Sequence, residues 1–176
     1  MRNVAFIALG FLILILQAAV SSLVPLRWLA PNLLLPVVIY LGVSHDIAIV
    51  RGAALSFVLG YLLDSFCGSP MGLQTFVMVA TFMAARSAGL RLFLRGPLFQ
   101  IGLTFGVGVG AGATVLALRA IFEPPSPFPV DEVWRTVVSL TVPALVTAVF
   151  SPIVFAVARR IDAALTRTRE EGAAPA

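Results

Sequence analysis

Charged residues divide this sequence into apolar segments of the length that a lipid bilayer requires. Of the 176 residues, 60% are apolar and only 11% are charged. A helix needs about 20 consecutive apolar residues to cross the hydrocarbon core. Segments of this kind bury their backbone polar groups by forming helices. We therefore expect an all-α, polytopic integral membrane bundle.

Six apolar segments fit this expectation, and we expect about six transmembrane helices. The clear spans are residues 4–24, 52–66, 72–85, 97–122 and 137–157. The weak one, residues 31–43, would rise only about 20 Å as a helix. It either extends to Val50 or forms a short or tilted helix that its neighbours shelter. We favour six crossings with a short second helix.

The first segment has two interpretations. Arg2, the apolar run 6–16 and the small residues around Val20 are typical of a cleaved signal peptide. The apolar run continues to Val24, however, and further crossings follow it. We therefore favour an uncleaved anchor helix.

The arginine residues predict the orientation of the chain in the membrane. All 12 basic residues are Arg, and positively charged loops stay on the cytoplasmic side. With a cytoplasmic N-terminus, nine Arg residues fall inside and two outside, with Arg119 near the outer end of the fifth span. Both termini should then be cytoplasmic. We expect one transmembrane domain over residues 1–165 and a disordered cytoplasmic tail over residues 166–176, which is polar and rich in small residues.

Composition excludes several functions. The net charge of +4 does not indicate nucleic-acid binding, because the Arg residues separate apolar runs and form no basic groove with interleaved aromatic residues. One Cys and one His are too few for a disulfide or a common zinc site. No nucleophile and base are paired at matched depth. We therefore expect no catalytic residues, no metal site and no cofactor, and the lipid bilayer as the surroundings.

The third span carries a small-residue stripe that ends in a carboxylate. The stripe repeats every four residues and so follows one helix face: Gly52, Ser56, Gly60 and Asp64. Small residues allow another helix to approach closely. An unpaired charge in hydrocarbon costs about 2.5–3.5 kcal/mol, so Asp64 needs a partner or a wet position. Arg119 lies at a comparable predicted depth, so we expect either an Asp64–Arg119 ion pair or two side chains that reach headgroups or water separately.

The fifth span carries a second stripe of the same spacing. It consists of Gly102, Gly106 and Gly110, with Gly108 and Gly112 offset to another face. In a bilayer such a stripe permits tight helix contact. We favour packing within the bundle over a dimer interface.

The region from residue 31 to residue 72 resembles the rod shape-determining protein MreD family. The resemblance rests on Pro31-Asn32-Leu33 through Pro36, on Gly52, on Gly60-Tyr61-Leu62-Leu63-Asp64 and on Pro70-Met71-Gly72. Its most specific part is a Gly-x-x-x-Asp followed, after a short gap, by Gly72, which opens the next helix. It implies a multi-pass protein of the bacterial inner membrane with an N-terminal anchor helix.

The resemblance also implies a function. Members of the family are non-enzymatic components of the cell-elongation complex, which builds lateral peptidoglycan. The expected partners are a bitopic MreC-like protein and, through it, a transpeptidase, a glycosyltransferase and the MreB-like filament. The resemblance further implies a fold similar to the S component of energy-coupling-factor transporters. The alternative function is thus a solute-binding transporter subunit, with Asp64, Gln74 or Arg119 contacting a polar ligand.

Overall fold

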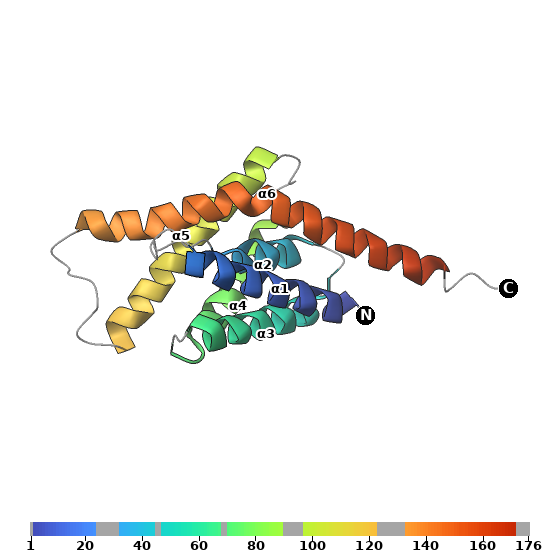
Figure 1. The fold of residues 1–176 in the computed structure, drawn as a ribbon, viewed down its shortest axis with the longest axis horizontal. Helices are drawn as coiled ribbons and strands as arrows, with labels where there is room; N and C mark the ends of the chain where they lie inside the picture. Colours follow the sequence, from blue (N-terminus) through green and yellow to red (C-terminus); the bar gives the residue numbers. More distant parts are fainter. Residues whose placement is uncertain are drawn as a thin grey trace.

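The computed structural model describes residues 2–23, 32–44, 47–67, 70–89, 97–122 and 133–171. These residues form six helices, and Figure 1 shows how they are arranged. They are α1 (Arg2–Leu23), α2 (Leu34–Val43), α3 (Ile49–Cys67), α4 (Leu73–Gly89), α5 (Pro97–Phe122) and α6 (Val133–Glu171). The described part contains no strand, which confirms the predicted all-α class.

Three of the six helices are long and apolar enough to cross a membrane. The qualifying stretches are Ile49–Phe66, Leu98–Phe122 and Trp134–Ala164. Shorter apolar stretches lie in the first two helices, Asn3–Ala19 in α1 and Leu34–Val43 in α2.

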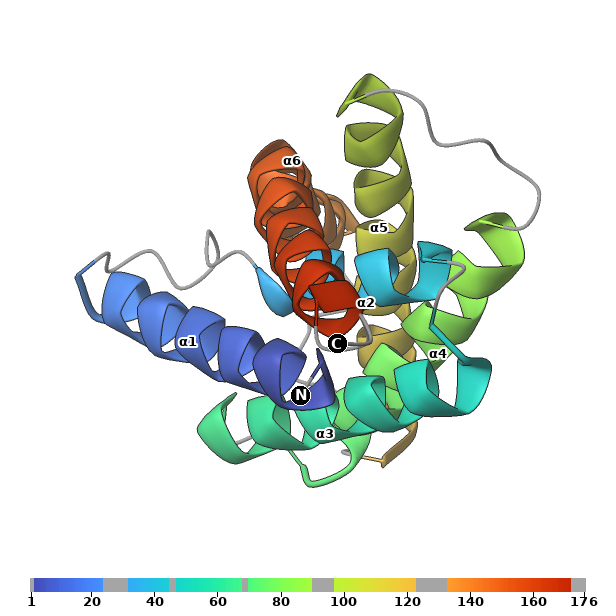
Figure 2. The same ribbon diagram turned by 90° about the vertical axis from the view of Figure 1, so that its right-hand side faces the viewer.

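The short helix α2 lies at the centre of the bundle, with the other helices around it (Figure 2). It has 10 residues and rises about 15 Å. The alternative extension to Val50 is wrong, because Ser44 adopts an extended conformation (φ −67°, ψ 115°) and ends the helix. Eight of its residues are buried, so α2 forms the core of the bundle.

Polar side chains from neighbouring helices satisfy the ends of α2. At its start, the backbone N–H of Asn32 donates to Thr147 Oγ1 (3.0 Å), and that of Leu33 donates to Gln17 Oε1 (3.3 Å). At its end, Arg86 Nη1 donates to the carbonyl oxygen of Ser44 (2.6 Å). A backbone group left unpaired in a dry interior is costly. These bonds therefore allow a helix of under three turns to lie inside an apolar bundle.

Helices α1, α3 and α4 pack around α2 as one apolar core. From α1, Phe6 and Leu14 are buried in the same cluster as Leu59 of α3 and Phe82 of α4. Gly10 allows α1 to lie close to α3, because a Cβ there would overlap the side chain of Leu59. The first helix thus contributes to the core of the bundle.

Helices α5 and α6 cross steeply on the other side of α2 (Figure 1). Pro143 and Pro152 lie inside α6, where each removes a backbone donor from the helix. Pro152 leaves the carbonyl of Ala148 without its helical N–H, and Ser151 Oγ donates to that oxygen instead (2.7 Å). The hydroxyl therefore keeps this buried segment of α6 satisfied.

Helix α6 is longer than the sequence predicted. The apolar pattern indicated a span over residues 137–157, whereas the helix has 39 residues and ends at Glu171. Thr166 to Glu171 are helical in the structure, where the sequence predicted a disordered tail. Arg and Glu are good helix formers, so a polar segment of this composition readily extends an existing helix. Residues 172–176 lie outside the described part.

The contact between α2 and α4 generates the first prediction. A Cβ at Gly42 would lie 2.8 Å from Ala85 Cβ and 2.9 Å from the carbonyl oxygen of Phe82. We expect Gly42→Ala to force the two helices apart and to cost about 1–3 kcal/mol of stability. Gly102→Ala is the control, because nothing lies within 4 Å of its added Cβ. Thermal unfolding of purified protein in detergent measures both, and equal midpoints for the two variants would contradict the prediction.

Candidate functional site

Asp64 lies in the last turn of α3, and its carboxylate accepts hydrogen bonds from the residues that begin α4. The side chain is 2% exposed. Its Oδ1 accepts the backbone N–H of Gln74 (2.9 Å), and its Oδ2 accepts those of Gly72 and Thr75 (3.0 Å each). The hydroxyl of Thr75 also donates to Oδ2 (2.7 Å). A carboxylate that receives unpaired helix N–H groups acts as an N-cap, here supplied by a preceding helix.

Two glycines make this arrangement possible. Gly72 has φ +99°, a conformation that favours glycine and that starts α4 in the required direction. A Cβ at Gly60 would lie 2.6 Å from Thr75 Cα and 3.1 Å from the carbonyl oxygen of Gln74. Gly60 therefore lets the start of α4 approach α3 one turn before Asp64. We call these five residues, Gly60, Asp64, Gly72, Gln74 and Thr75, the α3–α4 clasp.

The start of the α3 stripe, at Gly52, also contacts α4. A Cβ at Gly52 would overlap the ring of Phe82. Ser56 is fully buried and donates its hydroxyl to the carbonyl oxygen of Gly52 (2.8 Å). The stripe and the clasp thus share one helix face.

The proposed ion pair between Asp64 and Arg119 stays a prediction. The four donors to Asp64 described above all belong to the start of α4. Arg119 lies near the end of α5, half-buried, and its Nε is buried with no hydrogen-bond partner among the described residues. The requirement that Asp64 have partners in a dry position is met by backbone N–H groups, which sequence reasoning did not identify.

The two glycine stripes of α5 face different surroundings. Gly108 and Gly112 face α6, where added Cβ atoms would lie 3.2 Å from Ala144 Cβ and 2.7 Å from Leu140 Cδ2. At Gly102, Gly106 and Gly110 an added Cβ would meet no described atom within 4 Å. Packing within the bundle therefore holds for the first pair and not for these three, within the described part of the chain.

The open stripe is longer than the three glycines. At 100° per residue, Ala113, Ala117 and Ala120 continue the same face, and all six positions are exposed. Large apolar side chains stand at its two ends, among them Leu98 and Phe122, which are 84% and 76% exposed. The sequence reasoning missed the three alanines, although their angular position identifies them. We call the six residues Gly102, Gly106, Gly110, Ala113, Ala117 and Ala120 the α5 small-residue face.

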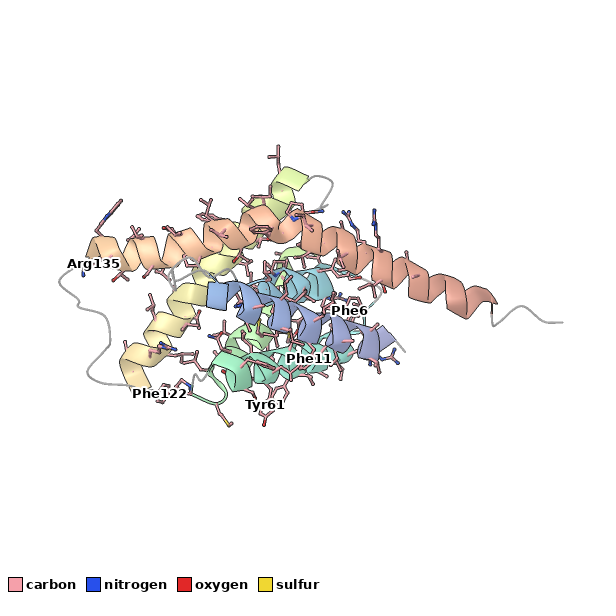
Figure 3. All side chains as sticks on the ribbon, in the orientation of Figure 1. Phe6, Phe11, Tyr61, Phe122 and Arg135 are labelled. Carbon is pink, nitrogen blue, oxygen red and sulfur yellow. The ribbon has the colours of Figure 1, made fainter. Side chains whose placement is uncertain are left out.

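Much of the remaining outer surface carries large apolar side chains. Figure 3 shows Phe11 and Tyr61 at the surface of the bundle, and Arg135 pointing away from it at the start of α6. Phe11 and Tyr61 are 44% and 50% exposed. An apolar surface of this kind fits a lipid environment. The α5 small-residue face differs from this surface because its side chains are small.

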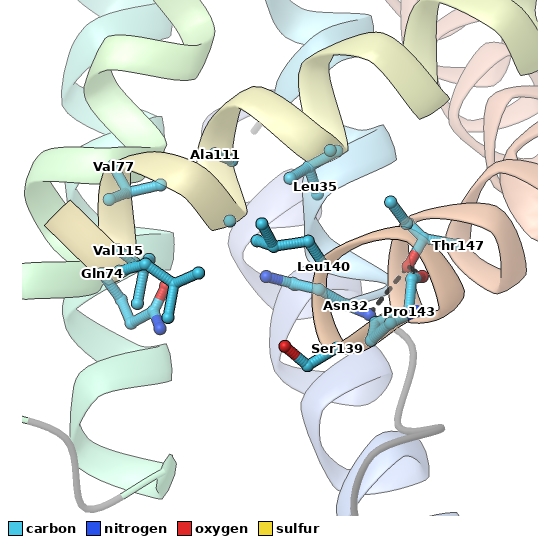
Figure 4. Close-up of a pocket in the computed structure, with 14 residues that line it drawn as sticks. Asn32, Leu35, Gln74, Val77, Ala111, Val115, Ser139, Leu140, Pro143 and Thr147 are labelled. Carbon is cyan, nitrogen blue, oxygen red and sulfur yellow. Dashed lines mark hydrogen bonds between the residues drawn. The ribbon is translucent and has the colours of Figure 1, made fainter. Parts of the chain in front are cut away.

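A cavity of about 260 Å³ lies between α2, α4, α5 and α6, with Asn32, two residues before α2, in its wall (Figure 4). Its polar lining residues are Asn32, Gln74, Ser139 and Thr147, and the rest of the lining is apolar or glycine. Gln74 thus uses its backbone for the clasp and its side chain for the cavity. Within the described residues, no three His, Cys, Asp or Glu side chains come together to hold a metal ion.

Comparison with known proteins identifies the family. The model of the rod shape-determining protein MreD family matches residues 2–161. The chain belongs to the MreD family. No curated protein and no solved structure matches the chain, so the likeness of the fold to transporter S components has no support from a structural match.

Membership of the MreD family gives the chain a role in rod shape determination, as a membrane protein of the MreBCD shape system. Gly60, Asp64 and Gly72, which carried the sequence resemblance, all belong to the α3–α4 clasp. The most specific part of the MreD-like pattern in this chain therefore has a structural explanation: it joins two consecutive helices.

The clasp predicts a strong effect of replacing Asp64. Asp64→Asn exchanges an acceptor oxygen for an amide donor that faces N–H groups, and should cost about 1–3 kcal/mol. Asp64→Ala leaves all the donors unpaired and should cost more. Hydrogen exchange of the peptide 70–78 should accelerate in both variants, while that of α5 stays unchanged. The control is Ser65→Ala, whose exposed hydroxyl bonds only within its own helix turn. Unchanged hydrogen exchange in Asp64→Ala would show that the carboxylate does not stabilise the start of α4.

A double-mutant cycle tests the Asp64–Arg119 pair. If the two charges interact, the double variant should lose less stability than the sum of the losses in Asp64→Ala and Arg119→Ala, by about 0.5–3 kcal/mol. Thermal unfolding in detergent provides the three differences. Additive losses would mean that the two side chains act separately.

Proposed function

We propose that the chain is a non-enzymatic scaffold of the bacterial cell-elongation complex. It lies in the inner membrane, binds an MreC-like bitopic protein and helps organise lateral peptidoglycan synthesis. A peptidoglycan transpeptidase and a glycosyltransferase join through that partner, and an MreB-like filament joins indirectly. Membership of the MreD family supports the general role, and the α5 small-residue face supports the mode of binding.

The observation that carries this mode of binding is the low burial of α5. Within the span Leu98–Phe122 only Gln100 and Thr104 are buried, against 39% of the residues of Ile49–Phe66 in α3. Gly in a helix costs about 1 kcal/mol of helix stability relative to Ala, and contact with lipid does not offset this cost. Close approach of another helix offsets it, because helix association in a bilayer depends on the packing of small residues. A single transmembrane helix of an MreC-like partner fits such a face.

The arginine residues support the proposed orientation, with six crossings and both termini in the cytoplasm. Arg86 bonds the carbonyl at the end of α2. At the same end of α2, Tyr40 donates to Asp162 Oδ2 (3.4 Å), two residues beyond the exposed Arg160. Positive charges from α4 and α6 therefore gather at one end of the bundle, as the positive-inside rule expects of the cytoplasmic side.

The cavity beside Gln74 favours a second candidate function, the solute-binding subunit of an energy-coupling-factor type transporter. S components present Ala at four-residue spacing on the first helix to dock their partner. In this chain Ala8 is followed four residues later by Leu12, so the first helix lacks this docking pattern, which argues against the candidate. Recovery of an ATPase module with the purified protein would favour this candidate over the scaffold.

A bulky side chain on the α5 small-residue face tests the scaffold proposal. We expect Gly106→Ile to reduce co-purification of the MreC-like protein from native membranes about tenfold, equivalent to about 1.4 kcal/mol, and to turn rod-shaped cells round. The matched control is Ala80→Ile, at an exposed small residue of α4. Both variants must reach the membrane at wild-type level. Normal co-purification with Gly106→Ile would show that the partner binds another face.

A further inference from the structure

The cavity between α4, α5 and α6 has polar groups that the protein itself leaves available. Asn32 Oδ1 is buried with no hydrogen-bond partner among the described residues. Figure 4 shows the side chains of Asn32 and Gln74 reaching into the space from opposite sides. Buried polar atoms normally have partners. Asn32 Oδ1 has no surface open to the cavity, so the polar groups that a bound molecule can reach are the carboxamide of Gln74, which has no hydrogen-bond partner among the described residues, and the hydroxyl of Ser139.

The wall that carries these groups is held in place. Thr147 Oγ1 donates to the carbonyl oxygen of Pro143 (2.7 Å) and accepts the backbone N–H of Asn32 (3.0 Å). This hydroxyl ties α6 to the residues that precede α2. Pro143 itself has no N–H for the carbonyl of Ser139 one turn earlier. The α6 wall therefore includes a carbonyl without its helical N–H, while Thr147 Oγ1 both donates and accepts and Ser139 Oγ donates to the carbonyl oxygen of Thr136 (2.8 Å).

The lining has no charged side chain. A charged ligand group would lose its hydration there without gaining a counter-charge, which is strongly unfavourable. The carboxamide of Gln74 offers both a donor and an acceptor. The hydroxyl of Ser139, whose hydrogen is used within α6, offers an acceptor. Around them, Leu35, Val77 and Leu140 form apolar walls. The site thus suits a neutral group with hydroxyl, ester or amide functions on an apolar body.

We propose that this cavity binds such a neutral amphiphile. Its volume of about 260 Å³ is somewhat below that of typical small-molecule pockets. The occupant is then either a small solute or the head region of a larger neutral lipid, and both share the same chemistry. The proposal is independent of the partner on α5, because the cavity lies on the inner side of that helix and the α5 small-residue face on the outer side.

The test uses the full chain in native membranes. A photoactivatable, alkyne-tagged diacylglycerol is added, the membranes are irradiated, and labelled peptides are mapped. In parallel, the protein is extracted with styrene–maleic acid polymer and its bound small molecules are identified by mass spectrometry. The variants are Gln74→Met, which keeps the backbone bond to Asp64, and the milder Ser139→Ala. Gln100→Met is the matched control, since Gln100 is buried on α5 away from the cavity.

For a lipid occupant, we expect the probe to label the peptides of α5 and α6 that line the cavity. Labelling should fall about tenfold in Gln74→Met, the effect of one lost buried hydrogen bond. For a solute, a bound neutral mass should be found in wild type and Gln100→Met and be depleted in Gln74→Met and Ser139→Ala. Labelling and bound masses that are the same in all four proteins would overturn the proposal. Recovery of the MreC-like partner should not change, which separates this test from that of the scaffold.

Discussion

The carboxylate of Asp64 is the contact on which the rest of this bundle depends. A buried charge and an uncapped helix start are both costly in an apolar interior, and here each removes the cost of the other. Helix α4, fixed at its start by Asp64, packs against α2, α3 and α5. At its other end Arg86 reaches the carbonyl that ends α2. Two charged side chains therefore set the position of the helix that joins both sides of the molecule.

The central helix α2 illustrates the same constraint on a smaller scale. Its 10 residues rise about 15 Å, about half the thickness of the hydrocarbon core, so the polar groups at its ends need partners within the protein. Side chains from α1, α4 and α6, namely Gln17, Arg86 and Thr147, bond those ends. Each of these helices is thus tied to α2 by a directional contact in addition to apolar packing. Polar residues inside this bundle accordingly act mainly as partners of backbone groups.

The sequence allowed prediction of the helical class, of the bounds of α5 and of a stripe on α3 that ends in a carboxylate. It did not identify the partners of Asp64, because every residue carries a backbone N–H and no residue type marks the one that bonds. The extent of α6 was underestimated because its last turns are polar. An apolar pattern marks only the part of a helix that lies in the bilayer, so it does not show where such a helix ends. On α5, spacing alone could not decide which of two glycine stripes lies inside, since both repeat every four residues.

Small residues on both sides of α5 explain why the two proposed sites lie so close together. On the inner side, Gly108 and Gly112 bring α6 near, but they and Ala111 leave space beside α4 that no side chain fills. On the outer side, the α5 small-residue face leaves the helix without a partner in the described part of the chain. Helix α5 keeps its place through its packing against α6 and α4. The cavity and the α5 small-residue face therefore lie on opposite sides of one well-packed helix, so a substitution that lines one site need not disturb the other.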